Sequence, residues 1–181
     1  MLIRTRPTAD FASKNMEVDP AKGSILIRAN RNEEAGAINN QTDSWKFQFE
    51  KILHNASQDE TYEASSSEII QSVVEGYNGT ILCYGQTGAG KTYSMTGSST
   101  QYKYRGIVPR AINQVFALTS IRFDQSVTIR VSYAEVYNEK IRDLIPHLNQ
   151  GGKASEQAMK QDQNLQITDD NRGGVAIKGL T

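Results

Sequence analysis

Four residues near the middle of the chain, Gly85, Gly90, Lys91 and Thr92, have the spacing G-x-x-x-x-G-K-[ST] of a phosphate-binding loop. Glycines let backbone amides approach phosphate oxygens, because no side chain blocks the way. Lys91 supplies a mobile positive charge for the outer phosphates. The Thr92 hydroxyl is suited to bind a magnesium ion that bridges the same phosphates. These residue types therefore predict a site for a nucleoside triphosphate with Mg²⁺.

The residues on either side of the loop support this interpretation. Residues 80–84 form an unbroken apolar run, which predicts a parallel strand buried on both faces. A helix is expected to begin near Gly90 and to point its unpaired N–H groups at the anion. Strand, glycine loop and helix in this order favour the phosphate-binding function. The alternative is a glycine-rich turn that binds nothing, which this context disfavours.

The composition limits the class of protein. The chain has 181 residues, enough for one domain with a core, and a formal net charge of zero. A neutral chain is not expected to bind nucleic acid electrostatically. The single cysteine, Cys83, can form no internal disulfide and is predicted to be a small buried residue in a reducing compartment. No apolar run is long enough to span a membrane, so an intracellular, soluble protein is expected.

Several strands are expected to position the loop. Short strands are predicted at 1–6 and 24–29, and alternation of aromatic and polar residues predicts another at 45–49. A strong strand is predicted at 126–137, where apolar residues again alternate with polar ones.

Two helices are expected around the same loop. One is predicted over 57–76, because Ser57 and Glu60 have the spacing of a capping box and apolar residues then recur at helical intervals. The loop's own helix is expected to be interrupted over 97–105, and helix is predicted to resume at Pro109.

The last part of the chain is predicted to contain an insertion and a hairpin. Residues 148–163 are polar and rich in Gln, Gly and Lys, which predicts an insertion. Residues 165–177 predict two strands with a turn near 171–174. His54 and His147 lie in connections without a cluster of partners, so neither is expected to bind a metal or to act as an acid or base.

Together these segments resemble the N-terminal half of a kinesin motor domain. The matching blocks are 4–7, 47–49, 76–95, 105–110, 131–139 with 141–144, and 174–180. They follow one another in the order of the family and cover most of the chain. Residues 53–59 and 104–111 look most like kinesin family nine, the ciliary and flagellar group. A different phosphate-loop protein, such as a GTPase or a nucleotide kinase, would have no reason to contain the block at 133–144 or the final hairpin.

The resemblance implies an α/β fold of the phosphate-loop NTPase type, a three-layer sandwich around a central mixed, largely parallel sheet. It implies ATP with Mg²⁺, and Thr92 as the residue that binds the metal. The implied phosphate-binding residues are Gly85, Gln86, Thr87, Gly88, Ala89, Gly90, Lys91 and Thr92. In the family the R-x-R-P motif borders the adenine, here Arg4, Arg6 and Pro7, and Tyr93 would offer its ring to the same base. From the residues alone, Arg4 and Arg6 read as a solvated strand edge.

The resemblance also implies a microtubule partner and a cytoskeletal location, including a cilium or flagellum. Microtubules expose an acidic surface, so basic residues near the final hairpin are candidates for the contact, namely Lys140, Arg172 and Lys178. Isolated basic residues on hairpins are equally often only solvated. Nucleic acid and membrane are not expected partners.

Two family motifs do not occur in this sequence, switch I (N-x-x-S-S-R-S-H) and switch II (D-L-A-G-S-E). In kinesins the switches place the attacking water and sense the terminal phosphate. We therefore expect residues 1–181 to be the N-terminal half of a motor domain, with no catalytic residue of its own and with open sheet edges. The parent protein is expected to be a motor ATPase and the 181 residues alone to be inactive. The alternative is a kinesin-like half-domain that serves as a non-cycling binding module.

Overall fold

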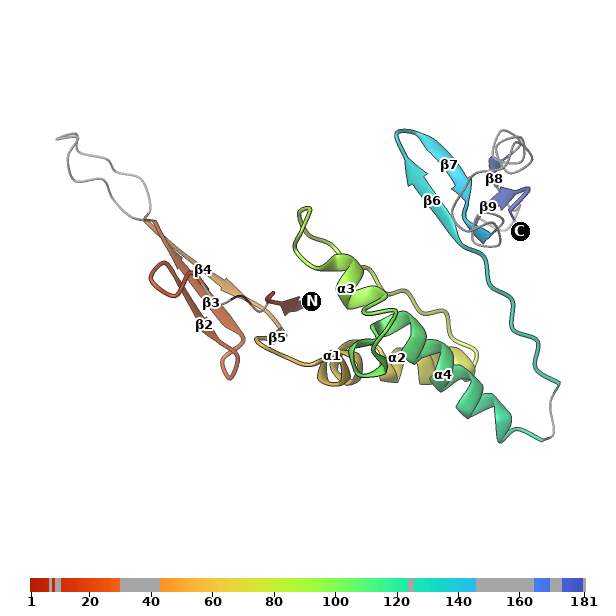
Figure 1. Ribbon diagram of the computed structural model, residues 1–181, viewed down its shortest axis with the longest axis horizontal. Helices are drawn as coiled ribbons and strands as arrows, with labels where there is room; N and C mark the ends of the chain where they lie inside the picture. Colours follow the sequence, from red (N-terminus) through yellow and green to blue (C-terminus); the bar gives the residue numbers. More distant parts are fainter. Residues whose placement is uncertain are drawn as a thin grey trace. The chain divides into compact units, whose positions relative to one another are not determined.

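The computed structural model describes residues 1–6, 8, 11–29, 43–123, 126–145, 165–169 and 174–180 (Figure 1). The chain divides into two compact units, Met1–Gln125 and Ser126–Thr181. No helix among the described residues combines the length and apolar character that a membrane crossing requires. The phosphate loop belongs to the first unit.

Two small sheets form in the first unit. Strand β1 (Leu2–Arg4) pairs in parallel with β5 (Lys51–Leu53). An antiparallel sheet has the order β2 (Met16–Asp19), β3 (Ser24–Arg28) and β4 (Ser44–Gln48). The strands predicted at 1–6, 24–29 and 45–49 are confirmed, whereas β2 and β5 were not predicted. Ile52 and Leu53 of β5 are buried, so this strand contributes to the small core.

The N-terminus of helix α1 (Gln58–Ser65) has the predicted capping box. The Ser57 hydroxyl accepts the backbone N–H of Glu60 at 3.1 Å, and the Glu60 carboxylate accepts the N–H of Ser57 at 2.8 Å. Both bonds satisfy amides that have no partner inside the helix. The box fixes where the helix begins, directly after the connection from β5.

The prediction of one helix over 57–76 is wrong, because the helix breaks at Ser66. Helix α2 (Ser67–Val74) follows this residue, whose φ of −136° is not helical. The Ser65 hydroxyl donates to the carbonyl of Thr61 at 2.7 Å and lies 2.8 Å from the Ser66 hydroxyl. Serine side chains that bond to nearby groups compete with helix geometry. The predicted end is confirmed, since α2 stops before Gly76, which has a φ of +106°.

Helix α4 (Ile107–Ser120) packs against α1 and α2, and Figure 1 shows the three helices side by side. The Tyr62 hydroxyl donates to the side-chain oxygen of Gln114, and the Gln114 amide donates to the carbonyl of Ser67 at 3.0 Å. Tyr62 and Ile107 are buried. The helix begins two residues before Pro109, which is tolerated in the first turn because no N–H is needed there.

The buried strand predicted at 80–84 is wrong. These residues are extended but belong to no sheet, and Leu82 and Tyr84 are 86% and 96% exposed. A strand needs a neighbouring strand to accept and donate its backbone hydrogen bonds. No described strand pairs with this segment, so Leu82 and Tyr84 remain in solvent.

The described residues of the second unit include two hairpins. Strands β6 (Ala134–Tyr137) and β7 (Lys140–Asp143) are joined by a turn in which Asn138 and Glu139 have φ values of +49° and +61°. Two positive φ values in a two-residue connection are typical of a type I′ turn. The strand predicted at 126–137 is therefore correct only from Ala134 onward.

The second hairpin confirms the strands predicted within 165–177. Strand β8 (Gln166–Asp169) pairs antiparallel with β9 (Val175–Lys178), and Ile167 lies opposite Ile177. The residues expected at its turn, except Gly174, lie outside the described residues, as does the insertion predicted at 148–163.

The described residues form four small sheets instead of the predicted central sheet. Only β1 and β5 pair in parallel; the other pairs are antiparallel. The strand predicted at 80–84 and the first part of the one predicted at 126–137, residues 126–133, belong to no described strand. These segments are rich in residues that favour strands, and their backbone is extended, but it does not pair with a described strand.

We expect Ser57→Ala to lower the free energy of unfolding by about 1 kcal/mol, because the variant loses the hydroxyl that accepts the Glu60 amide. Urea denaturation followed by circular dichroism measures this change. The matched control is Ser99→Ala, since Ser99 is exposed and caps no helix, and its effect should stay within about 0.5 kcal/mol. Equal effects of the two variants would contradict the capping role.

The same box predicts a pH dependence. Hydrogen bonding from the Ser57 N–H lowers the pKa of Glu60 below its ordinary 4.5. The stabilisation is therefore complete above the ordinary value and is lost as pH falls through the lower folded pKa. Glu60→Gln cannot ionise at this position, so the difference in free energy of unfolding between wild type and Glu60→Gln should shrink over that acidic interval and stay constant above it.

Candidate functional site

The predicted phosphate loop connects residues 80–84 to helix α3 (Lys91–Met95). Gly88 and Gly90 have φ values of +80° and +100°, in the left-handed region that favours glycine. A Cβ added at either residue would meet no atom within 4 Å. The requirement for glycine here is therefore conformational, and the space in front of the loop is open.

Four of the loop's carbonyl groups accept hydrogen bonds from the protein itself. Those of Gly85 and Gln86 accept the Lys91 ammonium at 2.8 and 2.9 Å, and that of Gln86 also accepts the Ala89 N–H at 3.1 Å. The Gly88 carbonyl accepts Arg6 Nη1 at 2.7 Å, and the Gly90 carbonyl accepts the Ser94 N–H at 2.9 Å. The negative ends of these peptide dipoles are thereby occupied.

The loop's amide groups show the opposite pattern. Within the described part of the chain, the N–H groups of Gly88, Gly90, Lys91 and Thr92 donate to no protein acceptor. Four unused donors in a span of five residues are what an anion-binding loop provides. Their exposure to solvent keeps them available to a ligand.

A cavity of about 710 Å³ opens in front of these amides. It is lined by Arg6, Thr87, Gly88, Gly90, Lys91, Thr92 and Tyr93. This lining contains two cationic side chains and no carboxylate, so its electrostatics favour an anion. The exposed Thr92 hydroxyl has no protein partner among the described residues. Free amides, a lysine and a hydroxyl fit the phosphates of a nucleotide with a hard cation such as Mg²⁺.

The three described residues that are expected near an adenine have different surroundings. Arg6 and Tyr93 line the cavity, and Arg6 holds the loop through Gly88. Arg4 instead donates to Gln58, Ser94 and Ala56, at 2.9, 2.9 and 3.3 Å. Its guanidinium lies 5.5 Å from the centre of the Tyr93 ring, and burial lowers its pKa. Pro7 lies outside the described residues.

Sequence reasoning missed Gln58, which connects Arg4 to the site. Gln58 is only 4% exposed, and its amide donates to the carbonyls of Tyr93 and Tyr104 at 2.8 and 3.1 Å. A signal was present, because a glutamine four residues before Tyr62 lies on the apolar face of its helix. A polar residue on such a face needs hydrogen-bond partners.

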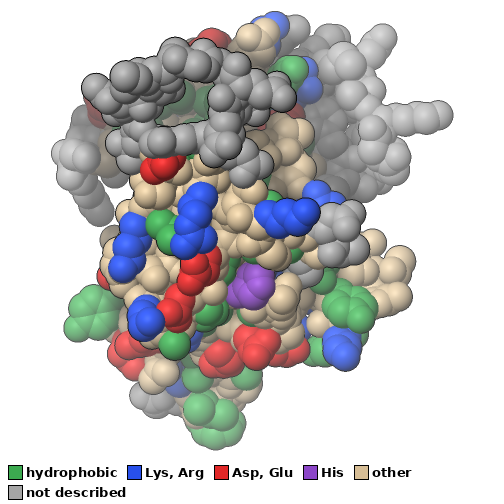
Figure 2. Space-filling view, turned by 90° about the vertical axis from the view of Figure 1, so that its left-hand side faces the viewer, with side chains coloured by type: hydrophobic (Ala, Val, Ile, Leu, Met, Phe, Trp, Pro, Cys, Tyr) green, Lys and Arg blue, Asp and Glu red, His purple; other side chains and the backbone are tan. Residues whose placement is uncertain are grey.

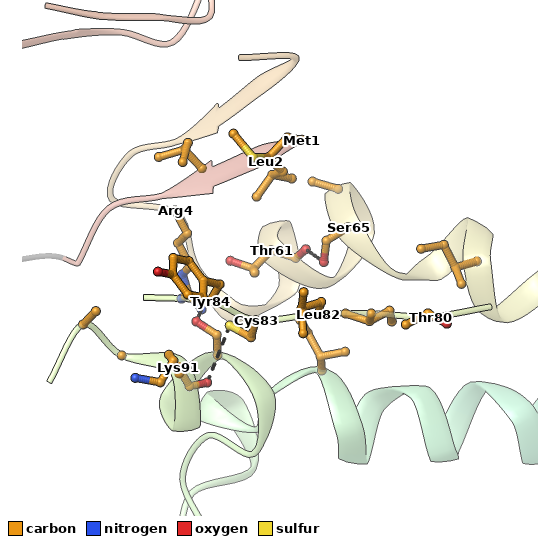
Figure 3. A pocket seen from close by; sticks show the side chains of 18 of the residues that line it. Met1, Leu2, Arg4, Thr61, Ser65, Thr80, Leu82, Cys83, Tyr84 and Lys91 are labelled. Atoms are coloured by element: carbon orange, nitrogen blue, oxygen red, sulfur yellow. Dashed lines mark hydrogen bonds between the residues drawn. The ribbon is translucent and has the colours of Figure 1, made fainter. Parts of the chain in front are cut away.

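A second cavity, of about 650 Å³, lies beside the loop (Figure 3). Its lining includes Met1, the residue before β1, together with Leu2 and Arg4 of β1, Thr61 and Ser65 of α1, and residues 80–84. Cys83 is among them and is half-buried, so the expectation of a fully buried cysteine is wrong. The reason is that residues 80–84 pair with no described strand, so the side chain of Cys83 stays partly exposed to solvent.

The histidine and the basic candidates have simple surroundings. His54 Nδ1 lies 2.9 Å from the Thr5 hydroxyl, which confirms a satisfied histidine. Lys140 begins β7 and Lys178 ends β9, and both are exposed. Arg172 lies outside the described residues. On the face drawn in Figure 2, Lys and Arg side chains lie among Asp and Glu, in keeping with the neutral net charge.

Comparison with known proteins decides the family. A model described as the kinesin motor domain matches residues 4–181. The chain belongs to the kinesin motor domain family. Kinesin-like protein KIF9 of Mus musculus is 44% identical over 179 residues, 99% of this chain and 22% of its own length. Kinesin-like protein KLP1 of Chlamydomonas reinhardtii is 36% identical over the whole chain, again 22% of its own length.

Membership of the kinesin family establishes an α/β fold of the phosphate-loop NTPase type. The expected likeness to family nine is confirmed by KIF9 of Mus musculus and by KIF9 of Homo sapiens, which is also 44% identical over 179 residues. The chain spans about a fifth of the length of these relatives.

We expect Arg4 and Arg6 to respond differently to substitution. Arg4→Ala should lower the free energy of unfolding by about 2 kcal/mol, because it leaves Gln58 and Ser94 without their charged donor. Arg6→Ala should change it by less than about 0.5 kcal/mol, because Arg6 is exposed and makes one bond. Urea denaturation of both variants tests this. The assignment of Arg4 to the framework would be wrong if the two losses were equal.

Proposed function

We propose that this chain is the ATP-binding part of a microtubule motor, in which ATP hydrolysis is coupled to microtubule binding and movement. The proposal rests mainly on the contrast between the loop's carbonyl groups and its amide groups. The carbonyls of Gly85, Gln86, Gly88 and Gly90 are bonded to the protein, whereas four unused amides, a lysine and a hydroxyl belong to residues that line a cavity without carboxylates. Membership of the kinesin family supports ATP as the nucleotide and the microtubule as the partner.

In this proposal Lys91 exchanges its ligands when ATP binds. Its ammonium leaves the carbonyls of Gly85 and Gln86 for the outer phosphates, which offer a full negative charge in place of two dipoles. The amides of Gly88, Gly90, Lys91 and Thr92 bind phosphate oxygens. Thr92 holds Mg²⁺, which would neutralise charge on the phosphates and polarise them.

The adenine lies against Tyr93 in this arrangement, at the edge of the cavity that the ring shares with Lys91 and Thr92. Arg6 contributes its charge and holds the loop at Gly88. Arg4 supports the far side of the Tyr93 platform, 5.5 Å from the ring centre. The two arginines of the R-x-R-P motif thus have different roles, because Arg4 supports the Tyr93 ring and Arg6 lies where the ligand binds.

Hydrolysis requires groups that this cavity does not supply. None of the side chains that line it is a carboxylate or a histidine, so none can orient a water as a general base. We propose that the parent protein's switch motifs supply this function and also complete the sheet beside residues 80–84. Residues 1–181 alone would then bind nucleotide without turning it over. A parent protein that also failed to turn over ATP would favour a non-cycling binding module.

The microtubule contact is proposed for the second unit, at Lys140 and Lys178 together with Arg172. Lys140 and Lys178 are exposed on hairpins, where an acidic surface can approach them. A cytoskeletal location follows, and the likeness to KIF9 and KLP1 supports a cilium or flagellum as one place where such a motor works.

We expect Lys91→Ala in the full-length protein to weaken ATP binding by about 10- to 100-fold, because a charged hydrogen-bonding group is lost. The fold should survive, since Lys91 is only half-buried and its ammonium bonds loop carbonyls alone. Titration with a fluorescent ATP analogue measures the affinity, and the exposed Lys46→Ala is the control. Unchanged affinity would remove Lys91 from the site.

We expect Lys140→Glu combined with Lys178→Glu to weaken microtubule binding about three- to tenfold, because exposed charge pairs each contribute little. Co-sedimentation with microtubules measures the change, which should diminish as salt is raised. Lys46→Glu reverses an equally exposed charge in the other unit and should leave binding intact. A double variant that behaves like this control would exclude the hairpins from the contact.

A further inference from the structure

Gln58 joins four separate segments through one buried amide. It is the first residue of α1, and its oxygen accepts Arg4 Nη1 of β1 at 2.9 Å. Its nitrogen donates to the carbonyl of Tyr93 in α3 at 2.8 Å and to that of Tyr104, in the 3₁₀ turn Tyr102–Tyr104, at 3.1 Å. Both donor hydrogens are therefore used, and the amide can take only this orientation.

The position of the Tyr93 ring depends on these bonds in two ways. Gln58 holds the backbone of Tyr93 directly through the carbonyl. It also orients Arg4, whose guanidinium lies 5.5 Å from the ring centre. The ring itself is 44% exposed and lines the cavity in front of the phosphate loop. One face is thus supported by protein, and part of the ring remains free for a ligand.

We propose that Gln58 is a positioning residue that fixes Tyr93 as the platform for the base of the bound nucleotide. The proposal rests on the proposed function and adds a source of selectivity. A triphosphate without a base needs only the loop, whereas a nucleoside triphosphate also needs the ring at the correct distance from it. Gln58 therefore determines how much more tightly the protein binds ATP than inorganic tripolyphosphate.

The test compares two ligands in the full-length protein. Competition against a fluorescent ATP analogue gives the affinities for Mg²⁺–ATP and for Mg²⁺–tripolyphosphate. Gln58→Met keeps the volume and removes both donors and the acceptor. We expect ATP to bind about tenfold more weakly, the size of effect that base–aromatic stacking commonly has, and tripolyphosphate to stay within about twofold.

A second variant separates positioning from folding. Gln58→Glu keeps an acceptor for Arg4 but turns a carboxylate toward the carbonyls of Tyr93 and Tyr104. Mg²⁺–tripolyphosphate carries more negative charge than Mg²⁺–ATP, so an added carboxylate weakens its binding at least as much. The ratio of the two affinities should still fall, but by less than in Gln58→Met. The controls Gln101→Met and Gln101→Glu change an exposed glutamine next to the same 3₁₀ turn and should leave the ratio unchanged.

A double-variant cycle tests whether Gln58 acts through Tyr93. Tyr93→Ala should lower the ratio by itself, and adding Gln58→Met to it should change the ratio by less than about twofold. The proposal is overturned if the Gln58 variants leave the ratio unchanged, or if their full effect persists without the Tyr93 ring. Failure of the wild-type protein to bind either ligand would instead refute the nucleotide site itself.

Discussion

In the loop at 85–92, peptide carbonyls bond to the protein while peptide amides stay available to a ligand, and the rest of the site depends on this difference. The carbonyls of Gly85, Gln86, Gly88 and Gly90 are bonded by Lys91, Ala89, Arg6 and Ser94, whereas the amides of Gly88, Gly90, Lys91 and Thr92 have no acceptor in the described structure. Left-handed φ values at Gly88 and Gly90 permit this path. Because an amide without a partner costs free energy when it is buried, such a loop is stable only where water or a ligand reaches it.

The surrounding elements hold the loop without covering it. The capping box fixes the start of α1 and places Gln58 where it bonds Tyr93. Arg4, the last residue of β1, bonds Ser94 of α3, and Arg6, two residues later, bonds the loop. Polar contacts carry this framework, since few apolar side chains are fully buried. The same interactions position the loop and the Tyr93 ring beside it, so the recognition of phosphates and the recognition of the base depend on the same residues.

Local features could be predicted from the sequence, and features that depend on distant partners could not. The capping box at Ser57 and the end of α2 before Gly76 follow from neighbouring residues. The strand at 80–84 did not form, because β preference needs an adjacent strand. In the site, the spacing of Gly85, Gly90, Lys91 and Thr92 identified the loop. Gln58 and the divergence of Arg4 from Arg6 required the fold, because their partners lie 35 to 90 residues away.

The most direct test is a crystal structure of the full-length protein grown with Mg²⁺ and a non-hydrolysable ATP analogue at saturating concentration. The account predicts phosphate oxygens on the amides of Gly88, Gly90, Lys91 and Thr92. The Lys91 ammonium should have moved from the carbonyls of Gly85 and Gln86 to the outer phosphates. An empty loop with Lys91 still on those carbonyls would contradict the account.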